Sequence, residues 1–153
     1  MTNWFECKVK YEKTLETGTQ KKVNESYLVD AMTFTDAEAR IIEEMTPYIV
    51  GEFEVTAVKK ARISELFQDP QGDKWYRCKV MFITLDEKSG VEKKTASNML
   101  VQARSFEEAV KNLSDGMKGT MSDWEINTIT ETTLMDVFGL EVKETAPIEG
   151  AQN

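Results

Sequence analysis

The side chains that could do chemistry in this 153-residue chain are few, because it contains two cysteines and no histidine. Histidine is the commonest general base, the commonest transition-metal ligand and the usual pH switch near neutrality. Its absence disfavours hydrolytic triads, zinc fingers and non-haem iron centres together. Carboxylate chemistry remains open, since Mg²⁺ needs only one or two carboxylates and water.

The carboxylates closest to such an arrangement are Asp36, Glu38 and the pair Glu43–Glu44, all in a predicted helix. Consecutive acids diverge around a helix, and acids near its start are favoured by the helix dipole, so a solvated face explains them better. A nucleophile, a base and an orienting group cannot be assembled from the sequence. We therefore predict no catalysis, no metal and no cofactor.

Cys7 and Cys78 occupy equivalent places in two predicted strands, flanked by apolar residues such as Val9 and Val80. Unpaired cysteine behaves as a small buried hydrophobe, so we favour buried thiols over a disulfide. A metal site would need further ligands, and a reactive thiol would need a base beside it.

These strands belong to an internal repeat. The segment WFECKV at 4–9 matches WYRCKV at 75–80 in sequence and in its place within each half. A glycine with a following lysine pair recurs as well, as do the apolar positions of a helix. Shared periodicity alone would match apolar positions but would not match tryptophan, cysteine, glycine and a lysine pair together.

Each copy has the same pattern of elements. Residues 4–12 alternate between apolar and polar, which indicates a half-buried strand, and a turn at Gly18 returns the chain as its antiparallel partner. A helix follows, opened by Thr33 or Ser105 as the N-cap, and its apolar stripe begins at Phe34 or Phe106. A third strand comes next. Short alternating segments that end at Phe67 and Phe138 are candidates for a fourth strand in each copy.

We therefore predict an α+β fold, a tandem duplication of a ββαβ(β) unit. Antiparallel hairpins would pack against two helices over a common core, with pseudo-two-fold symmetry. The expected organisation is one domain, 1–138, made of repeats 3–67 and 74–138 joined by a linker, 68–73. Residues 139–153 are expected to form a flexible tail.

The chain resembles a family of short proteins of unknown function from gut (Bacteroides-type) bacteria and their phages or mobile elements. The segments that carry the resemblance include WFECKVKYEKTLE, YLVDAMTFTDAEARIIEEMTP and EKKTASNMLVQA. The family offers no activity, cofactor or site residue to transfer. A mobile-element setting mildly favours DNA handling or host interaction, by association only.

Charge is distributed unevenly along the chain. The formal net charge is −8, which argues against a uniformly basic nucleic-acid-binding surface. Each predicted hairpin nevertheless carries five basic residues against three acidic ones. The outward hairpin faces therefore form a candidate binding surface, consisting of Trp4, Lys8, Lys10, Lys21, Lys22, Trp75, Arg77, Lys79, Lys93 and Lys94.

Two functions fit such a surface. Exposed tryptophans or an edge strand could meet an unknown protein partner, or a second copy in a homodimer. Alternatively, bases of single-stranded nucleic acid could stack on the rings while amines contact phosphates, although the interleaved glutamates weaken that reading. We favour the protein-interaction module. No apolar run could span a membrane and no secretory signal is recognisable, so we expect a cytoplasmic location.

Overall fold

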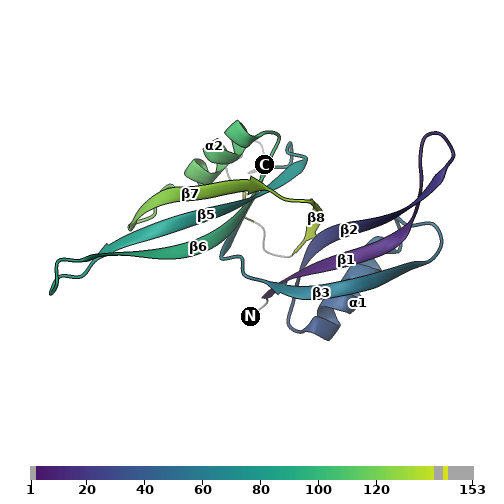
Figure 1. Ribbon diagram of the computed structural model, residues 1–153, viewed down its shortest axis with the longest axis horizontal. Coiled ribbons are helices and arrows are strands. Elements are labelled where there is room, and N and C mark those ends of the chain that lie inside the picture. The colour runs from purple at the N-terminus through teal and green to yellow at the C-terminus, as the bar shows by residue number, and fades with distance from the viewer. Residues whose placement is uncertain (1–2, 140–142, 145–153) are drawn as a thin grey trace, which may run out of the picture. The chain divides into compact units, whose positions relative to one another are not determined.

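The computed structural model describes residues 3–139 and 143–144. Over these residues the chain is α+β, with two helices and two mostly antiparallel sheets (Figure 1). It divides into two compact units. Unit 1 combines Met1–Arg62 with Thr133–Leu140, and unit 2 combines Ile63–Thr132 with Glu141–Asn153.

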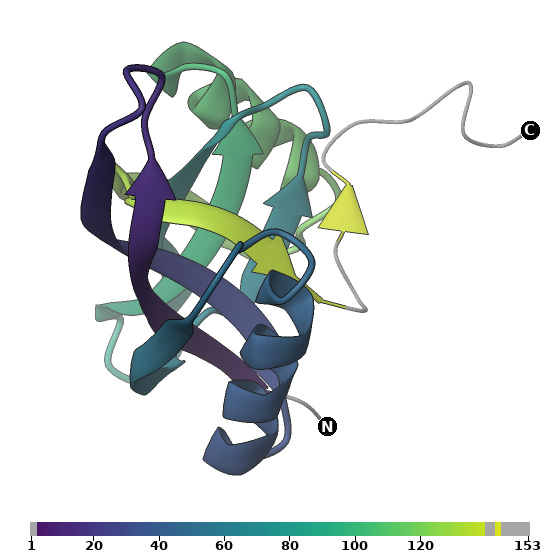
Figure 2. The same ribbon diagram turned by 90° about the vertical axis from the view of Figure 1, so that its right-hand side faces the viewer.

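Unit 1 is built on a long hairpin of β1 (Asn3–Thr14) and β2 (Gln20–Ala31), paired antiparallel along their whole lengths. β3 (Phe53–Ala61) pairs with the other side of β1, and α1 (Phe34–Met45) packs on one face of this sheet, as Figure 2 shows. The strand order is β3-β1-β2-β8, in which β8 is Leu134–Phe138.

Unit 2 repeats this arrangement with β5 (Lys74–Leu85), β6 (Glu92–Ala103), α2 (Phe106–Gly116) and β7 (Asp123–Glu131). Its strand order is β7-β5-β6-β4-β9. Even the register shift between the first and third strands recurs, after Lys8 in unit 1 and after Lys79 in unit 2. The predicted fold class is confirmed as two similar ββαβ-like halves.

The helices begin where the sequence predicts. The hydroxyl of Thr33 accepts a hydrogen bond from the Asp36 N–H at 3.1 Å, and that of Ser105 accepts one from the Glu108 N–H at 3.2 Å. Phe34 and Phe106, where the apolar stripe was predicted to start, are 55% and 53% exposed. The ring of Phe34 nevertheless packs edge-on against Phe5 of the core, with ring centroids 4.9 Å apart.

Each unit has its own core. In unit 1 the helix side chains Ala37, Ile41 and Met45 meet the alternate strand residues from Phe5 onward. In unit 2 the corresponding helix side chains, Ala109, Leu113 and Met117, meet the face that carries Cys78. The helices thus cover two separate clusters, where the sequence predicted a common core beneath them. Other apolar side chains are buried outside both clusters, namely Leu28, Leu66, Trp75, Leu100 and Leu134.

The fourth strands are exchanged between the units. β4 (Glu65–Gln68) follows the first ββαβ segment, yet it pairs in parallel with β6 of unit 2. β8 follows the second segment, yet it pairs in parallel with β2 of unit 1. The two short strands were predicted, but the sheets that they join were not. Each compact unit therefore combines stretches far apart in sequence, unlike the continuous repeats 3–67 and 74–138.

The expected linker and tail fall beside these exchanged strands. Gln68 is the last residue of β4, so the linker 68–73 connects β4 directly to β5. Most of the expected tail, 139–153, lies outside the described residues. Within it, Lys143–Glu144 form β9, which pairs in parallel with β4.

Candidate functional site

The two cysteines are buried, as predicted. Cys7 and Cys78 are each 0% exposed and carry no disulfide. Burial, with a smaller contribution from Glu6 and Glu38, raises the pKa of the Cys7 thiol to about 11. Burial alone raises the pKa of Cys78 to about 12. A thiol that stays protonated at neutral pH is a poor nucleophile and a poor metal ligand, so both side chains serve as packing groups.

The predicted binding surface divides between the two faces of each sheet. Residues opposite each other in an antiparallel pair point to the same side. Lys22 pairs with Glu12 and so shares the face of Trp4, Lys8 and Lys10, which is the face away from the helix. We call this the helix-distal face.

Two of the predicted cations lie elsewhere. Lys21 pairs with Lys13, and Lys93 pairs with Thr84, which places both on the helix side of their sheets. The remaining members in unit 2 share its helix-distal face, namely Trp75, Arg77, Lys79 and Lys94. A single outward surface containing all ten residues therefore does not form.

The tryptophans are covered. Trp75 is 3% exposed, so the prediction of an exposed ring at this position is wrong. Trp4 is half-buried, and its indole ring lies against Gly139, at the end of β8. Both rings lie on the helix-distal faces, as the alternation predicted. Alternation gives the face of a side chain, whereas burial on that face depends on segments distant in sequence.

The lysines on the helix-distal face of unit 1 alternate with acids across the strands. Lys10 is the register partner of Glu54, Lys59 that of Glu6, and Lys22 that of Glu12. In unit 2, Lys94 forms an ion pair of 3.4 Å with Glu125. Opposite charges facing each other stabilise a sheet. These pairings balance part of the charge, whereas the register partners of Lys8, Arg77 and Lys79 are uncharged.

A polar cluster in unit 1 was missed. The hydroxyls of Tyr11 and Tyr27 both donate hydrogen bonds to Oε1 of Glu25, at 2.7 and 3.0 Å, and Lys13 lies 3.6 Å from Oε2. Burial, followed by the bond to Glu25, raises the pKa of Tyr11 to about 12 and raises that of Tyr27 further. The cluster satisfies a carboxylate whose side chain is only 10% exposed.

A second polar cluster joins helix to sheet in each unit, with different chemistry. In unit 1, Arg40 on α1 donates to Asp30 on β2 at 3.0 Å, and Asp30 has a side chain only 5% exposed. At the matching positions of unit 2, Asn112 donates to the Gln102 carbonyl at 2.9 Å and to Asp69 at 3.0 Å. An ion pair in one copy is thus replaced by an amide network in the other.

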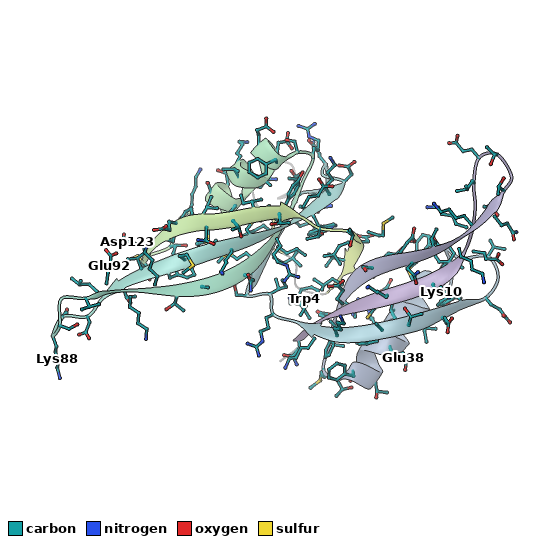
Figure 3. The ribbon with its side chains drawn as sticks, in the orientation of Figure 1. Trp4, Lys10, Glu38, Lys88, Glu92 and Asp123 are labelled. Carbon is teal, nitrogen blue, oxygen red and sulfur yellow. The ribbon has the colours of Figure 1, made fainter. Side chains whose placement is uncertain are left out.

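The hollow that could accept a ligand lies in unit 1, between α1 and the start of β3. Its volume is about 500 Å³. We call it the α1–β3 groove, and its lining consists of Glu38, Ile42, Thr46, Gly51, Glu52, Phe53, Glu54 and Val55. Figure 3 shows Glu38 projecting from α1. A second depression, of about 410 Å³, adjoins the groove through Glu52, Phe53 and Glu54 and reaches Lys10 on β1.

The groove has an apolar floor and an acidic rim. Phe53 and Val55 are partly buried against the core, and Ile42 remains 43% exposed. Among the described residues, no cation forms an ion pair with Glu38, Glu52 or Glu54. Apolar groups exposed beside unpaired charge suit recognition better than they suit folding.

The matching region of unit 2 differs at most of these positions. Val110 stands where Glu38 stands, Ser114 where Ile42 stands, and Lys118 where Thr46 stands. Glu125, the counterpart of Glu54, is paired with Lys94. The two copies therefore share the acidic and apolar pattern on the third strand, with Asp123–Ile126 in unit 2, and differ on the helix side of the groove. Comparing the two copies position by position in the sequence could have pointed to this difference.

The described residues contain no group of three or more acidic or cysteine side chains placed to hold a metal ion. No helix in residues 3–139 is both long and apolar enough to cross a membrane.

The fold and the groove define a class of small α+β proteins made of two similar halves with an open edge beside one helix. The chain belongs to a family defined by a domain of unknown function (DUF4494), whose model matches residues 3–140. The predicted resemblance to an uncharacterised family is confirmed to that extent, and an origin in gut bacteria or phages stays an expectation. No curated protein matches the chain.

Proposed function

We propose that this protein is a non-catalytic protein-binding module that contacts its partner through the α1–β3 side of unit 1. The observation that carries the proposal is a group of exposed apolar side chains at the groove and in the loop leading to it. Ile42 is 43% exposed, Tyr48 75% and Val50 97%. Apolar side chains gathered beside a groove with polar rims are typical of protein-interaction sites.

The adjacent strand supports the same proposal. β3 has β1 as its neighbour in the sheet and lies at the edge, so its outer backbone groups are open to another strand. Edge strands are templates for strand addition, in which backbone hydrogen bonds supply affinity and side-chain pockets supply specificity. The second half of β3 carries Lys59 and Lys60, and lysines on an edge strand discourage such pairing. The segment Phe53–Val55, beside the groove, contains no lysine.

Single-stranded nucleic-acid binding is the alternative, and it gains no support from the site geometry. Stacking needs accessible rings, but Trp75 is buried and Trp4 is half-covered. Phosphate contacts need an excess of cations, and Lys10, Lys22 and Lys59 face acids in the register, which leaves Lys8, Arg77 and Lys79 with uncharged register partners. Binding rather than catalysis is favoured because both thiols are buried and Glu25 and Asp30 are engaged in structural hydrogen bonds. The cytoplasmic location remains a prediction from the sequence.

Site-specific photocrosslinking tests the proposal. A photoreactive phenylalanine analogue placed at Tyr48 in the full chain should give a discrete adduct in the native host. Ile42→Asp puts a charge on the groove floor at an exposed helix position, where the fold should tolerate it, and should reduce the adduct at least about fivefold.

The chain supplies matched controls. Ser114→Asp introduces the same charge at the position of α2 that corresponds to Ile42 and should leave the adduct unchanged. The analogue at Met121, which is 97% exposed in unit 2, should give no discrete product. Equal adducts from the Tyr48 and Met121 positions, or an adduct insensitive to Ile42→Asp, would refute the proposal.

A further inference from the structure

The chemistry of the partner can be inferred from the groove, given the proposed function on which this step rests. We infer that the groove and the first half of β3 bind an extended peptide segment that alternates apolar side chains with lysine or arginine. The occupant is a segment of another protein, added as a strand at the edge of unit 1.

The conformation follows from the edge. A segment that pairs with β3 must itself be extended, so its successive side chains point to opposite faces. The side chains on the helix side then reach the hollow of about 500 Å³ above Phe53 and Val55, closed on its other side by Ile42. That volume accommodates apolar side chains of leucine or phenylalanine size, and it lies on the same face as the core of unit 1.

The charge follows from the rim. Glu38, Glu52 and Glu54 line the groove, and in the part of the chain that the structure describes none of them has an ion-pair partner. Glu38 borders the apolar floor from α1, whereas Glu54, the register partner of Lys10, lies on the opposite face of β3. An added strand that alternates apolar and basic residues presents its apolar side chains to the floor and its lysine or arginine side chains to the face of Glu54, while acidic segments are repelled, which gives specificity.

The same charges set the position of the segment along the strand. Lys59 and Lys60 on the second half of β3 would repel a basic peptide, whereas Glu52 and Glu54 flank the first half. The irregular register at Lys8/Val9 separates the two halves of β3. A basic segment is therefore confined to the end beside α1.

The second copy differs mainly on its helix, because Asp123, Trp124, Glu125 and Ile126 keep the acidic and apolar pattern of the third strand. At the corresponding positions Glu38 is replaced by Val110 and Ile42 by Ser114. The carboxylate of Glu125 is already paired with Lys94, and Lys118 adds a positive charge beside Asp115. Unit 2 should thus bind such a peptide poorly, which makes it an internal control.

Peptide selection followed by titration tests the inference. Random twelve-residue peptides displayed on phage would be selected against the full-length protein, and the best binder would be synthesised for fluorescence anisotropy. We expect lysine or arginine alternating with apolar residues. We also expect Glu52→Gln/Glu54→Gln to weaken binding about tenfold, because each exposed ion pair contributes modestly. The matched variant Asp123→Asn/Glu125→Gln removes two charges at the corresponding positions of unit 2 and should change affinity less than twofold.

The other outcomes are distinguishable. If the selected peptides lack basic residues and Ile42→Asp in the protein weakens their binding, the inference is overturned and the proposed function stands. Selection that yields no peptide sensitive to Ile42→Asp would overturn both. Dimerisation of the protein alone, lost in Glu52→Gln/Glu54→Gln, would overturn the inference in favour of a second copy as the occupant.

Discussion

The indole ring of Trp4 lies over Gly139, so close that a Cβ atom at position 139 would be 2.5 Å from Cη2 of the tryptophan. The contact joins the start of β1 to the residue that follows β8, the strand that the second half of the chain gives to unit 1. Glycine is needed at 139 because any side chain there would displace the ring.

Gly139→Ala should therefore destabilise unit 1. Overpacking at a close contact costs about 1–3 kcal/mol in the free energy of unfolding, which urea denaturation followed by circular dichroism would measure. Trp4→Phe removes the ring atoms nearest to Gly139, so the double variant Trp4→Phe/Gly139→Ala should show a smaller loss than the two single losses added together. If the two losses in the free energy of unfolding added exactly, the Trp4 ring could move away from a side chain at position 139 without any cost in stability.

Arg40→Asn should lower the free energy of unfolding by about 2–3 kcal/mol, because it takes the guanidinium away from the buried Asp30 carboxylate. Asp30→Gln/Arg40→Asn installs the residue types of unit 2 and should recover more than half of that loss. Arg104→Asn is the control. Because its pair with Glu108 is exposed, this substitution should change the free energy of unfolding much less than Arg40→Asn does. A double variant no more stable than Arg40→Asn would show that the two polar clusters are not interchangeable.

Glu25→Gln should lower the pKa of Tyr11 from its value of about 12, since it removes the charge that opposes formation of the phenolate. Burial is the larger cause of the raised pKa, so the shift should be partial. Ultraviolet absorbance of tyrosinate during alkaline titration measures it, and Tyr11→Phe identifies which transition belongs to this residue. The variant should fold, because Phe82 occupies the matching place in unit 2. An unchanged titration would remove Glu25 as a cause.

Both thiols should react slowly in the native protein. A disulfide reagent at pH 8 should modify Cys7 and Cys78 at least about a hundredfold more slowly than in urea, because modification requires both opening of the core and deprotonation. The single variants Cys7→Ala and Cys78→Ala allow each rate to be measured separately. Rapid stoichiometric modification without urea would contradict the burial of these side chains.

The same pKa shifts predict loss of stability in alkali. The ordinary thiol pKa of 9.0 rises to about 11 at Cys7 and about 12 at Cys78 in the fold. The folded protein thus holds these protons more tightly than the unfolded chain does. Their contribution to stability is complete below pH 9 and is lost as the pH rises through 11 and 12. The urea midpoint should be lower at pH 10.5 than at pH 8. The double variant Cys7→Ala/Cys78→Ala should show a smaller decrease between these two pH values.

Local patterns in the sequence predicted the elements well. Alternation from Phe5 to Tyr11 placed the buried face of β1, and the caps at Thr33 and Ser105 placed the starts of both helices. These features depend on neighbours a few residues away, so the sequence displays them directly. Phe34 joins the stripe through its contact with Phe5 yet stays half exposed, because helical spacing says which stripe a residue joins but not how completely it is covered.

Partners distant in sequence could not be predicted in this way. Four residues such as Glu65–Gln68 suffice to indicate a strand, but they carry no signal for which hairpin will receive it. The half-burial of Trp4 likewise involves Gly139, far along the chain. The groove could not be predicted, because in the sequence Ile42 fits the apolar stripe of a helix and Glu52 fits a loop. These two residues line one groove only because α1 packs on β3.

The exchange of β4 and β8 also fixes the order in which the protein can mature on the ribosome. β2 presents an unfinished edge from the moment its hairpin forms, and the strand that covers it, β8, is made more than a hundred residues later. The first half of the chain must therefore wait, partly assembled, until Leu134–Phe138 has emerged. A stop codon or a protease that acts before Leu134 would leave a sheet ready to pair with any other unfinished chain nearby.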